Sequence, residues 1–215
     1  MGYKDEDFIL RQAKQMGEAL GNILGQEAAD EIMMVEAEQG QKKSDEILFR
    51  KTIPTDVPAI MLLIQDATAY LKEQGSPQWQ NNQAPTEETI QNDIKNDVSY
   101  VLTLNHEVVG LCALIAEKDS AYEAIDGAWN DLGTDTYVAI HRVAVSSNYR
   151  GLGLGQKLLE EAIKKAQSLG YQDIRIDTYP TNGPMLHLID KVGFTYQGMI
   201  EFDFINGERK AFQLI

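Results

Sequence analysis

The chain has 215 residues, 43% of them hydrophobic, and a formal net charge of −14. This length fits one domain with an appendage or two small domains, and so acidic a balance argues against nucleic-acid binding, which requires a basic surface. There is no apolar run of about 18 residues, no hydrophobic signal segment at the start, and one cysteine, Cys112, which cannot form an internal disulfide; we therefore expect a cytoplasmic protein that does not contact a membrane.

Residues 1–46 are predicted to form an N-terminal helical arm and linker, separate from a domain at 47–215. Apolar side chains between Ile9 and Ile23 recur every three or four residues, which is the spacing of one face of an amphipathic helix. Three roles remain open for this arm. It packs on its own domain, it forms the contact of a homodimer, or it binds a partner protein.

The rest of the sequence predicts an α/β (α+β) domain built on a mixed sheet. A βαβ crossover is expected within 137–178, and Asn206-Gly207 predicts a tight hairpin turn between the last two strands. Thr55 or Asp56 is expected to cap the first helix. The expected elements are strand 47–52, helix 56–73, helix 87–96, strands 99–104, 108–115 and 136–145, helix 156–169, strand 174–178, helix 185–191, and strands 195–199 and 209–215.

A long acidic loop interrupts the predicted sheet at 117–135. A loop of this length inside a compact domain is usually functional, and this one carries Tyr122, Glu123 and Trp129. The two aromatic side chains, together with Trp79 in an earlier loop, either form the wall of a pocket or cap the core.

A glycine-rich segment follows the strand that ends at Val145. Gly151, Gly153 and Gly155 alternate with other residues, and the apolar periodicity of a helix begins directly after them. Glycine lets the backbone approach a ligand closely, and the free N–H groups of a helix start attract anions. We therefore expect a phosphate or pyrophosphate at 150–156. The spacing matches neither the Gly-x-Gly-x-x-Gly dinucleotide motif nor the P-loop.

Further motifs surround the glycine segment. Arg150-x-x-Gly-x-Gly follows a β-branched strand, Asn182 follows the next strand, and Lys191-Val-Gly-Phe precedes the last two strands. Together these motifs resemble the acetyl-CoA-binding region of the GNAT superfamily of N-acetyltransferases. The resemblance covers about residues 47–215 and implies the GNAT fold, in which a splayed sheet of seven-stranded type is flanked by helices.

The resemblance implies that acetyl-CoA is the co-substrate and that no metal takes part. The pantetheine would pair with the strand backbone, and a strand N–H such as that of Val143 would polarise the thioester carbonyl. The glycine segment would hold the pyrophosphate, with Arg150 and Lys157 as local cations. The cofactor-binding residues implied are Val143, Ala144, Val145, Arg150, Gly151, Leu152, Gly153, Leu154, Gly155, Gln156 and Asn182.

The acceptor amine would attack the thioester directly, which requires a base because a free alkyl amine has a pKa of about 10. His141, two residues before Val143 on the same strand face, is the first candidate for this base. Glu123 and Asp126 in the acidic loop are the second candidates.

The departing thiolate also needs a proton. Many family members supply it from a tyrosine four residues before the glycine of the Gly-Phe pair, but that position is Ile189 here. Tyr179 or Tyr196 is expected to replace it, Tyr179 first, or solvent supplies the proton.

The acidic loop favours a cationic acceptor, either a small-molecule or a peptide amine. A polyamine, an amino sugar, a lysine and an α-amine all meet this description. The missing tyrosine and the extra arm leave a second hypothesis open, in which the protein is a non-catalytic acetyl-CoA-binding sensor.

Overall fold

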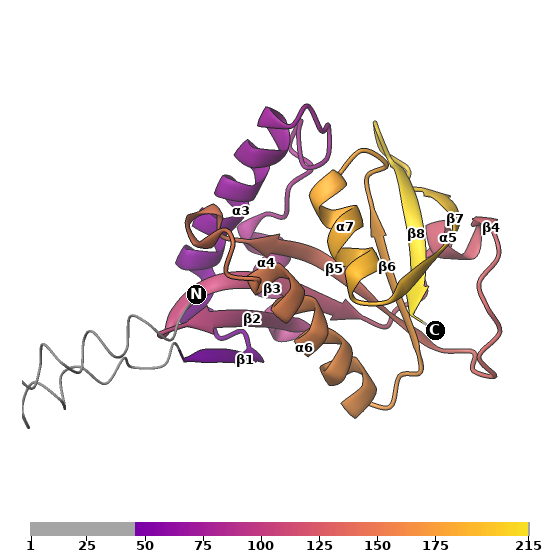
Figure 1. Ribbon diagram of the computed structural model, residues 1–215, viewed down its shortest axis with the longest axis horizontal. Coiled ribbons are helices and arrows are strands. Elements are labelled where there is room, and N and C mark those ends of the chain that lie inside the picture. Colours follow the sequence, from indigo (N-terminus) through magenta and orange to yellow (C-terminus); the bar gives the residue numbers. More distant parts are fainter. Residues whose placement is uncertain (1–45, 215) are drawn as a thin grey trace, which may run out of the picture. The chain divides into compact units, whose positions relative to one another are not determined.

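The computed structural model describes residues 46–214, and the predicted N-terminal arm lies outside the described residues. Figure 1 shows strands and helices along this part of the chain. The elements in chain order are β1 (Ile47–Lys51), the 3-10 turn η1 (Pro54–Asp56), α3 (Val57–Glu73), α4 (Glu87–Lys95), β2 (Ser99–Leu104), β3 (Glu107–Ile115), α5 (Ser120–Glu123), β4 (Asp126–Gly127), β5 (Tyr137–Val145), the 3-10 turn η2 (Ser147–Tyr149), α6 (Leu154–Ser168), β6 (Asp173–Thr178), α7 (Gly183–Lys191), β7 (Phe194–Glu201) and β8 (Glu208–Leu214).

The strands form one mixed sheet in the order β1-β2-β3-β5-β6-β8-β7-β4. Its one parallel pair is β5 with β6, joined by the α6 crossover, and all other neighbours are antiparallel. The parallel register runs from Tyr137 opposite Asp173 to Ile140 opposite Ile176, after which the two strands diverge (Figure 1). This confirms the predicted mixed, splayed sheet, with the two-residue β4 as an eighth strand.

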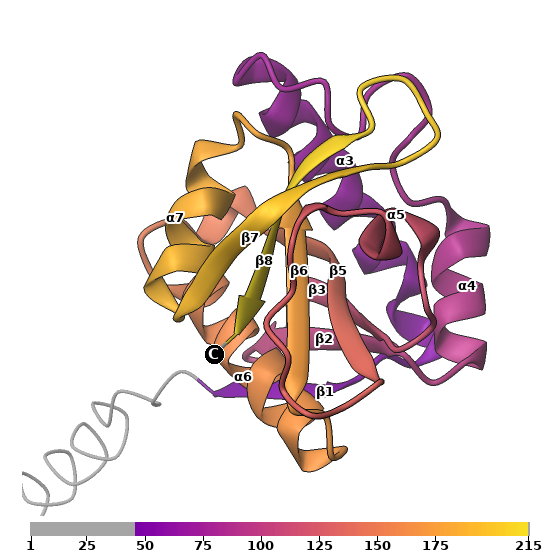
Figure 2. The same ribbon diagram turned by 90° about the vertical axis from the view of Figure 1, so that its right-hand side faces the viewer.

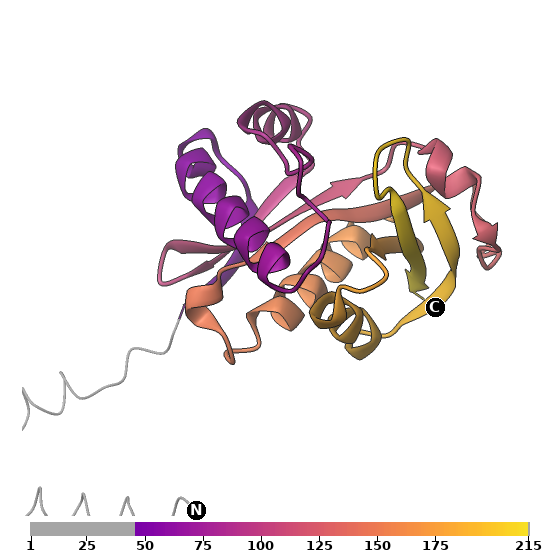
Figure 3. The same ribbon diagram turned by 90° about the horizontal axis from the view of Figure 1, so that it is seen from above.

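Helices cover both faces of the sheet (Figure 3). On one face, side chains of α6 such as Leu158 and of α7 such as Ile189 share a core cluster with Ile140 and Ile176. On the other face, α3 and α4 pack against β2 and β3 in a second cluster that contains Ile60. Burial of each such aliphatic side chain stabilises the fold by about 1.5–3 kcal/mol. The sheet thus has a separate buried cluster under the helices of each face.

The first helix starts in a different way from the prediction. Asp56 does not cap α3 through its side chain. Its carboxylate instead accepts hydrogen bonds from the Arg50 guanidinium at 2.7 and 2.9 Å and from the Ile53 N–H at 2.9 Å. The capping prediction is wrong because a partner on β1, 6 residues away, competes for this carboxylate. The result is a bidentate ion pair between Arg50 and Asp56 that joins β1 to the start of α3.

The helix after the glycine segment begins at Leu154, earlier than the predicted start. Gly153 is its N-cap with φ of 71°, a left-handed conformation that favours glycine. Gly155 therefore lies in the first helical turn, and its role is packing: a Cβ there would be 2.8 Å from Leu188 Cδ1 on α7. Two of the three alternating glycines belong to the loop, and the third lets α6 and α7 approach each other.

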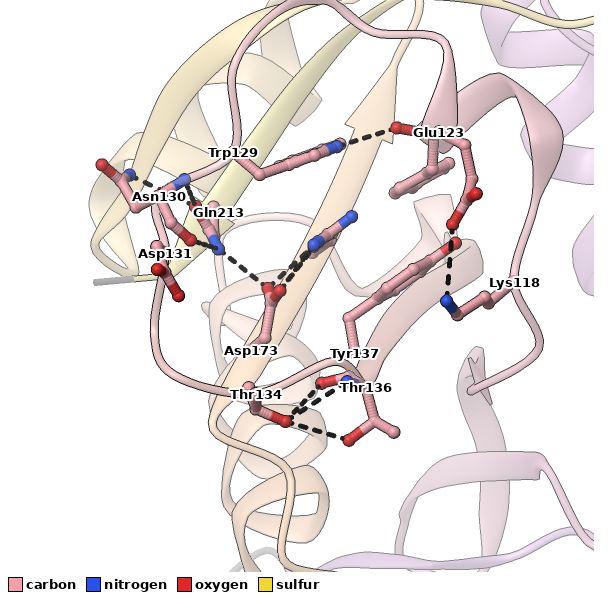
Figure 4. Close-up of polar contacts among 12 residues, drawn as sticks. Lys118, Glu123, Trp129, Asn130, Asp131, Thr134, Thr136, Tyr137, Asp173 and Gln213 are labelled. Atoms are coloured by element: carbon pink, nitrogen blue, oxygen red, sulfur yellow. Dashed lines mark hydrogen bonds and ion pairs between the residues drawn. The ribbon is translucent and has the colours of Figure 1, made fainter.

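The 117–135 segment is fastened to the sheet over much of its length (Figure 4). Trp129 donates its indole N–H to the Tyr122 carbonyl at 2.8 Å, and the Arg175 guanidinium lies 4.0 Å from the Trp129 ring centroid. The Asn130 N–H donates to Gln213 Oε1 at 2.8 Å. Trp129 and the fully buried Tyr122 therefore cap the core, which resolves the alternative that the sequence left open.

The predicted two-residue turn at Asn206-Gly207 is wrong. β7 ends at Glu201 and β8 begins at Glu208, so a longer loop of residues 202–207 joins them. This loop reaches the connection between α3 and α4, where Gln83 Nε2 donates to the Ile205 carbonyl at 2.9 Å (Figure 2). Two segments far apart in sequence are thereby joined beside the site described below.

Cys112 is a fully buried core residue, as predicted, and burial raises the pKa of its thiol to about 12. At pH 8 almost no thiolate exists in the folded state, so we expect a disulfide reagent to modify Cys112 only after the protein opens. The measurement is the rate of thiol modification in buffer, with complete reaction in denaturant as the control. Immediate stoichiometric modification of the folded protein would contradict this burial.

Candidate active site

A cavity of about 970 Å³ opens where β5 and β6 diverge. Its walls come from α3, the connection between α3 and α4, the second half of β5, the glycine segment, the end of β6, the start of α7 and the β7–β8 loop. The predicted phosphate site and His141 both lie in this one cavity.

One end of the cavity is shaped to receive an anion. Gly151 and Gly153 have φ of 83° and 71°, and a Cβ built on either glycine would have no heavy atom of the described chain within 4 Å. The first-turn N–H groups of α6 have no intrahelical acceptors and carry the positive end of the helix dipole. Arg150 adds a cation, held over the Tyr70 ring with its Cζ 4.2 Å from the ring centroid. We call this open anion site, formed by residues 150–156, the glycine cradle. Its shape and charge fit a pyrophosphate.

The second predicted cation turns away from the cradle. The Lys157 ammonium lies 3.0 Å from Glu161 Oε1, one turn further along α6, and Lys157 is not among the residues that line the cavity. Lys191 on α7 lines the cavity instead.

The middle of the cavity runs along the backbone of β5. On one side β5 pairs with β3, with Ala144 opposite Leu111. On the other side its pairing with β6 ends at Ile140, so the edge from residue 141 to 145 faces the cavity. An extended amide-containing chain such as pantetheine could bind this edge as an added strand does.

A β-bulge distorts this part of β5. His141 lies opposite Ala113 and Ala144 opposite Leu111, so two residues of β5 face one of β3. Arg142, within the bulge, has φ of 55°, an uncommon conformation for a residue other than glycine. Its Nε lies 3.1 Å from Asp93 Oδ2 on α4, and this ion pair holds the bulge to a helix of the other layer.

His141 lies beside a cluster of polar side chains centred on Asp177. His141 Nδ1 is 3.7 Å from Asp177 Oδ2, a distance at which the carboxylate acts mainly through its charge. The same oxygen accepts a hydrogen bond from the Tyr122 hydroxyl at 2.8 Å, and Arg209 Nε is 3.7 Å from Asp177 Oδ1. Asp177 is therefore fixed between three partners with its charge next to the imidazole.

Burial keeps His141 neutral at physiological pH. Desolvation lowers the pKa of the imidazole below 6.5, the Asp177 charge opposes part of this effect, and the Arg142 charge adds to it. The side chain is 21% exposed and lines the cavity. With Nδ1 toward the carboxylate, Nε2 is the nitrogen available to accept a proton.

Most of the predicted site residues meet in this cavity. Those that line it are His141, Val143, Ala144, Val145, Arg150, Gly151, Gly153, Leu154, Gly155, Gln156 and Asn182. Asn182 also caps α7 by accepting from the Met185 N–H at 3.3 Å, and its Nδ2 donates to Gln78 Oε1 at 3.1 Å.

Three predicted site residues lie elsewhere. Leu152 is 58% exposed and is not among the lining residues. Tyr179 donates its hydroxyl to Glu208 Oε1 at 2.7 Å, which raises the pKa of Tyr179, and this residue does not line the cavity either. Glu123 lies on a separate shallow depression, 3.9 Å from the Lys118 ammonium. Tyr196, the other tyrosine considered, is 51% exposed on the outer hairpin.

Two residues at the end of β6 belong to the site and were missed from the sequence. Asp177 and Thr178 both line the cavity. The signal was strand alternation: Ile174 and Ile176 point to one face, so Asp177 must point to the other. The register that brings this other face beside His141 depends on pairing between distant strands.

A mixed sheet whose two central strands diverge, with a glycine-rich helix start at the opening, defines a protein that binds acyl-coenzyme A. The chain belongs to the acetyltransferase (GNAT) family, because the model of that family matches residues 64–194, more than half of the chain.

Solved structures agree with this assignment. An acetyltransferase of the GNAT family from Streptococcus agalactiae is 33% identical with a TM-score of 0.70, over 79% of this chain and 95% of that one. The NatC complex bound to Gag peptide and CoA is 18% identical with a TM-score of 0.57, over 79% of this chain and 98% of that one, which shows the fold alone.

Among curated proteins, N-alpha-acetyltransferase 30 of Saccharomyces cerevisiae is 37% identical over 76 residues, 35% of this chain. The match covers 43% of that protein, so the chain spans less than half the length of this relative.

Within residues 46–214, His, Cys, Asp and Glu form no group of three or more that could hold a metal ion. In the same part of the chain, none of the helices combines the length and the apolar character needed to cross a membrane.

The glycine cradle can be tested with Gly153→Glu. The new carboxylate would enter the space expected for the pyrophosphate and repel it, so we expect acetyl-CoA affinity to fall by about 100-fold or more. Isothermal calorimetry measures this change. Gly133→Glu is the matched control, because Gly133 has φ of 70° and equally open surroundings but does not line the cavity. Equal affinities of the two variants would contradict the cradle.

Proposed function

We propose that the protein transfers an acetyl group from acetyl-CoA to a primary amine by direct attack, with His141 as the base. The observation that carries this proposal is the single cavity that joins the glycine cradle to the neutral His141. A co-substrate bound along this path would bring its thioester from the anion site toward a residue able to accept a proton.

Acetyl-CoA would supply the activated acetyl group, and residues of three segments would hold it. The backbone from Gly151 to Gln156, with Arg150, would bind the pyrophosphate. The free edge of β5 from Val143 to Val145 would bind the pantetheine amides. The N–H of Val143, beside the bulge, would polarise the thioester carbonyl.

The reaction needs one proton removed from nitrogen and one delivered to sulfur. The amine nitrogen forms a bond to the acetyl carbon, and the carbon–sulfur bond breaks with its electron pair left on sulfur. His141 Nε2 accepts the amine proton, directly or through water, and the nearby Asp177 charge stabilises the imidazolium that results. The thiolate then gains a proton, so the products are an N-acetyl amine and coenzyme A.

The acceptor would enter beside the 117–119 segment and the β7–β8 loop. Glu117, Lys118 and Asp119 line the cavity, as do aromatic side chains such as Phe202, and the Lys118 ammonium lies 3.9 Å from Glu123. Two carboxylates and aromatic walls support a cationic amine as acceptor. The name of the yeast relative is a reason to include peptide α-amines among the candidates.

The direct test is release of coenzyme A thiol from acetyl-CoA with a panel of amines that includes polyamines, amino sugars, lysine and short peptides. We expect turnover with at least one cationic member, with the acetylated amine identified by mass spectrometry. Ile189, fully buried where many family members have their tyrosine, keeps the sensor as the second candidate. Tight acetyl-CoA binding with no turnover on any amine would favour the sensor.

His141→Gln tests the base. We expect kcat to fall by about 100- to 1,000-fold with acetyl-CoA affinity retained, because glutamine cannot accept the proton. For the natural chain, kcat/KM should fall as pH decreases through the lowered pKa of His141, below 6.5. The variant should lack this decrease of kcat/KM at low pH, the acid limb of the pH profile. An unchanged pH profile would contradict the role of His141 as the base.

Asp177→Asn gives a second test of the base, because it changes the charge beside the His141 imidazole and leaves His141 in place. The Asp177 charge raises the pKa of His141 against the effect of burial. Its removal should move the acid limb of kcat/KM to still lower pH and also reduce kcat, because the imidazolium loses a stabilising charge. A limb that moves to higher pH would show that Asp177 does not act on His141 in this way.

A further inference from the structure

The hydroxyl of Thr178 has no explained role in the fold. Thr178 is the last residue of β6 and is 1% exposed. Its Oγ1 is buried and has no hydrogen-bond partner in the described chain, and the residue lines the cavity. A buried hydroxyl without a partner is unfavourable to folding, so its presence in a ligand cavity calls for a ligand atom as the partner.

Thr178 lies on the face of β6 that is covered by α7, the helix that carries Ile189. Side chains alternate along a strand, so Thr178 lies on the same face as Ile176, which packs in one core cluster with Ile189 of α7. Asp177 lies on the opposite face, next to His141. The end of β6 therefore places Asp177 beside His141 on one side of the opening and an unpaired hydroxyl on the side covered by α7.

We propose that the Thr178 hydroxyl donates a hydrogen bond to the coenzyme A sulfur and stabilises the thiolate as it leaves. This role rests on the proposed acetyl transfer, and it takes the place of the tyrosine that Ile189 replaces. When the carbon–sulfur bond breaks, the electron pair stays on sulfur and Thr178 keeps its proton. The thiolate then takes a proton from water, while the proton accepted by His141 returns to solvent, so the overall reaction balances.

The thiol itself provides a readout that does not need turnover. A free alkyl thiol has a pKa of about 8.5, and a hydrogen bond to its thiolate lowers that pKa. The experiment is a pH titration of the thiolate absorbance of coenzyme A bound to the full chain, with desulfo-coenzyme A as the blank. Thr178→Val removes the donor at nearly constant shape, and Thr178→Ser keeps it.

We expect the pKa of the bound thiol to be about one unit higher in Thr178→Val than in the natural chain and in Thr178→Ser. With an active amine, kcat of Thr178→Val should fall about 10- to 100-fold while acetyl-CoA affinity stays within about twofold. The melting temperature should be unchanged or higher, because valine removes an unpaired buried hydroxyl.

Thr68→Val is the matched control. Thr68 Oγ1, on α3, is also buried without a partner, but Thr68 does not line the cavity. We expect this variant to keep the thiol pKa and kcat of the natural chain. Any effect of exchanging an orphaned hydroxyl for a methyl group in general would appear in both variants.

The outcomes separate this proposal from the one on which it rests. An unchanged thiol pKa in Thr178→Val overturns the hydrogen bond, whatever the turnover of the natural chain. Affinity, melting temperature and kcat falling together would overturn it as well, because they would indicate a structural role. A shifted thiol pKa in a chain that acetylates no amine would support the hydrogen bond and overturn the proposed acetyl transfer.

Discussion

The end of pairing between β5 and β6 is the constraint on which the rest of the site depends. The two strands share a register only as far as Ile140 and Ile176. Beyond that point β5 stays paired with β3 and β6 stays paired with β8, and each strand follows its own neighbour. The backbone edge of β5 then needs other partners. Because the α6 crossover starts where β5 ends, the helix start with its free N–H groups lies at the same opening.

Strand alternation places the proposed base and the unpaired hydroxyl on different faces at this opening. His141 and Asp177 come from neighbouring strands and meet on one face, beside the fully buried Tyr122. Thr178, the next residue after Asp177, belongs to the other face with α7. In the proposed reaction the base would act on the amine nitrogen and the hydroxyl on the sulfur, which are different substituents of the reacting carbon. Two consecutive residues of an extended strand provide this separation without any further element.

Local patterns in the sequence predicted the elements well. The helical stripe that includes Leu158 and the alternation of Ile174 with Ile176 placed α6 and β6, and the glycine spacing identified a segment that lines the cavity. The β-bulge at Arg142, the pairing of Asp56 with Arg50 and the position of Asp177 beside His141 could not be predicted in this way. Each depends on which strand lies next to which and in what register, and spacing along one segment carries no information about a partner on another.

Two groups that oppose folding lie at the same opening. Arg142 has a left-handed backbone conformation, which costs about 1–3 kcal/mol. The unpaired Thr178 hydroxyl costs a similar amount, about 1–3 kcal/mol. Set against a total stability of about 5–15 kcal/mol, these costs persist only because the surrounding layers are well packed and Asp93 holds the bulge from α4. Neither group stabilises the fold that retains it, and both line the cavity that contains His141, so they support the proposed reacting centre independently of the glycine motif.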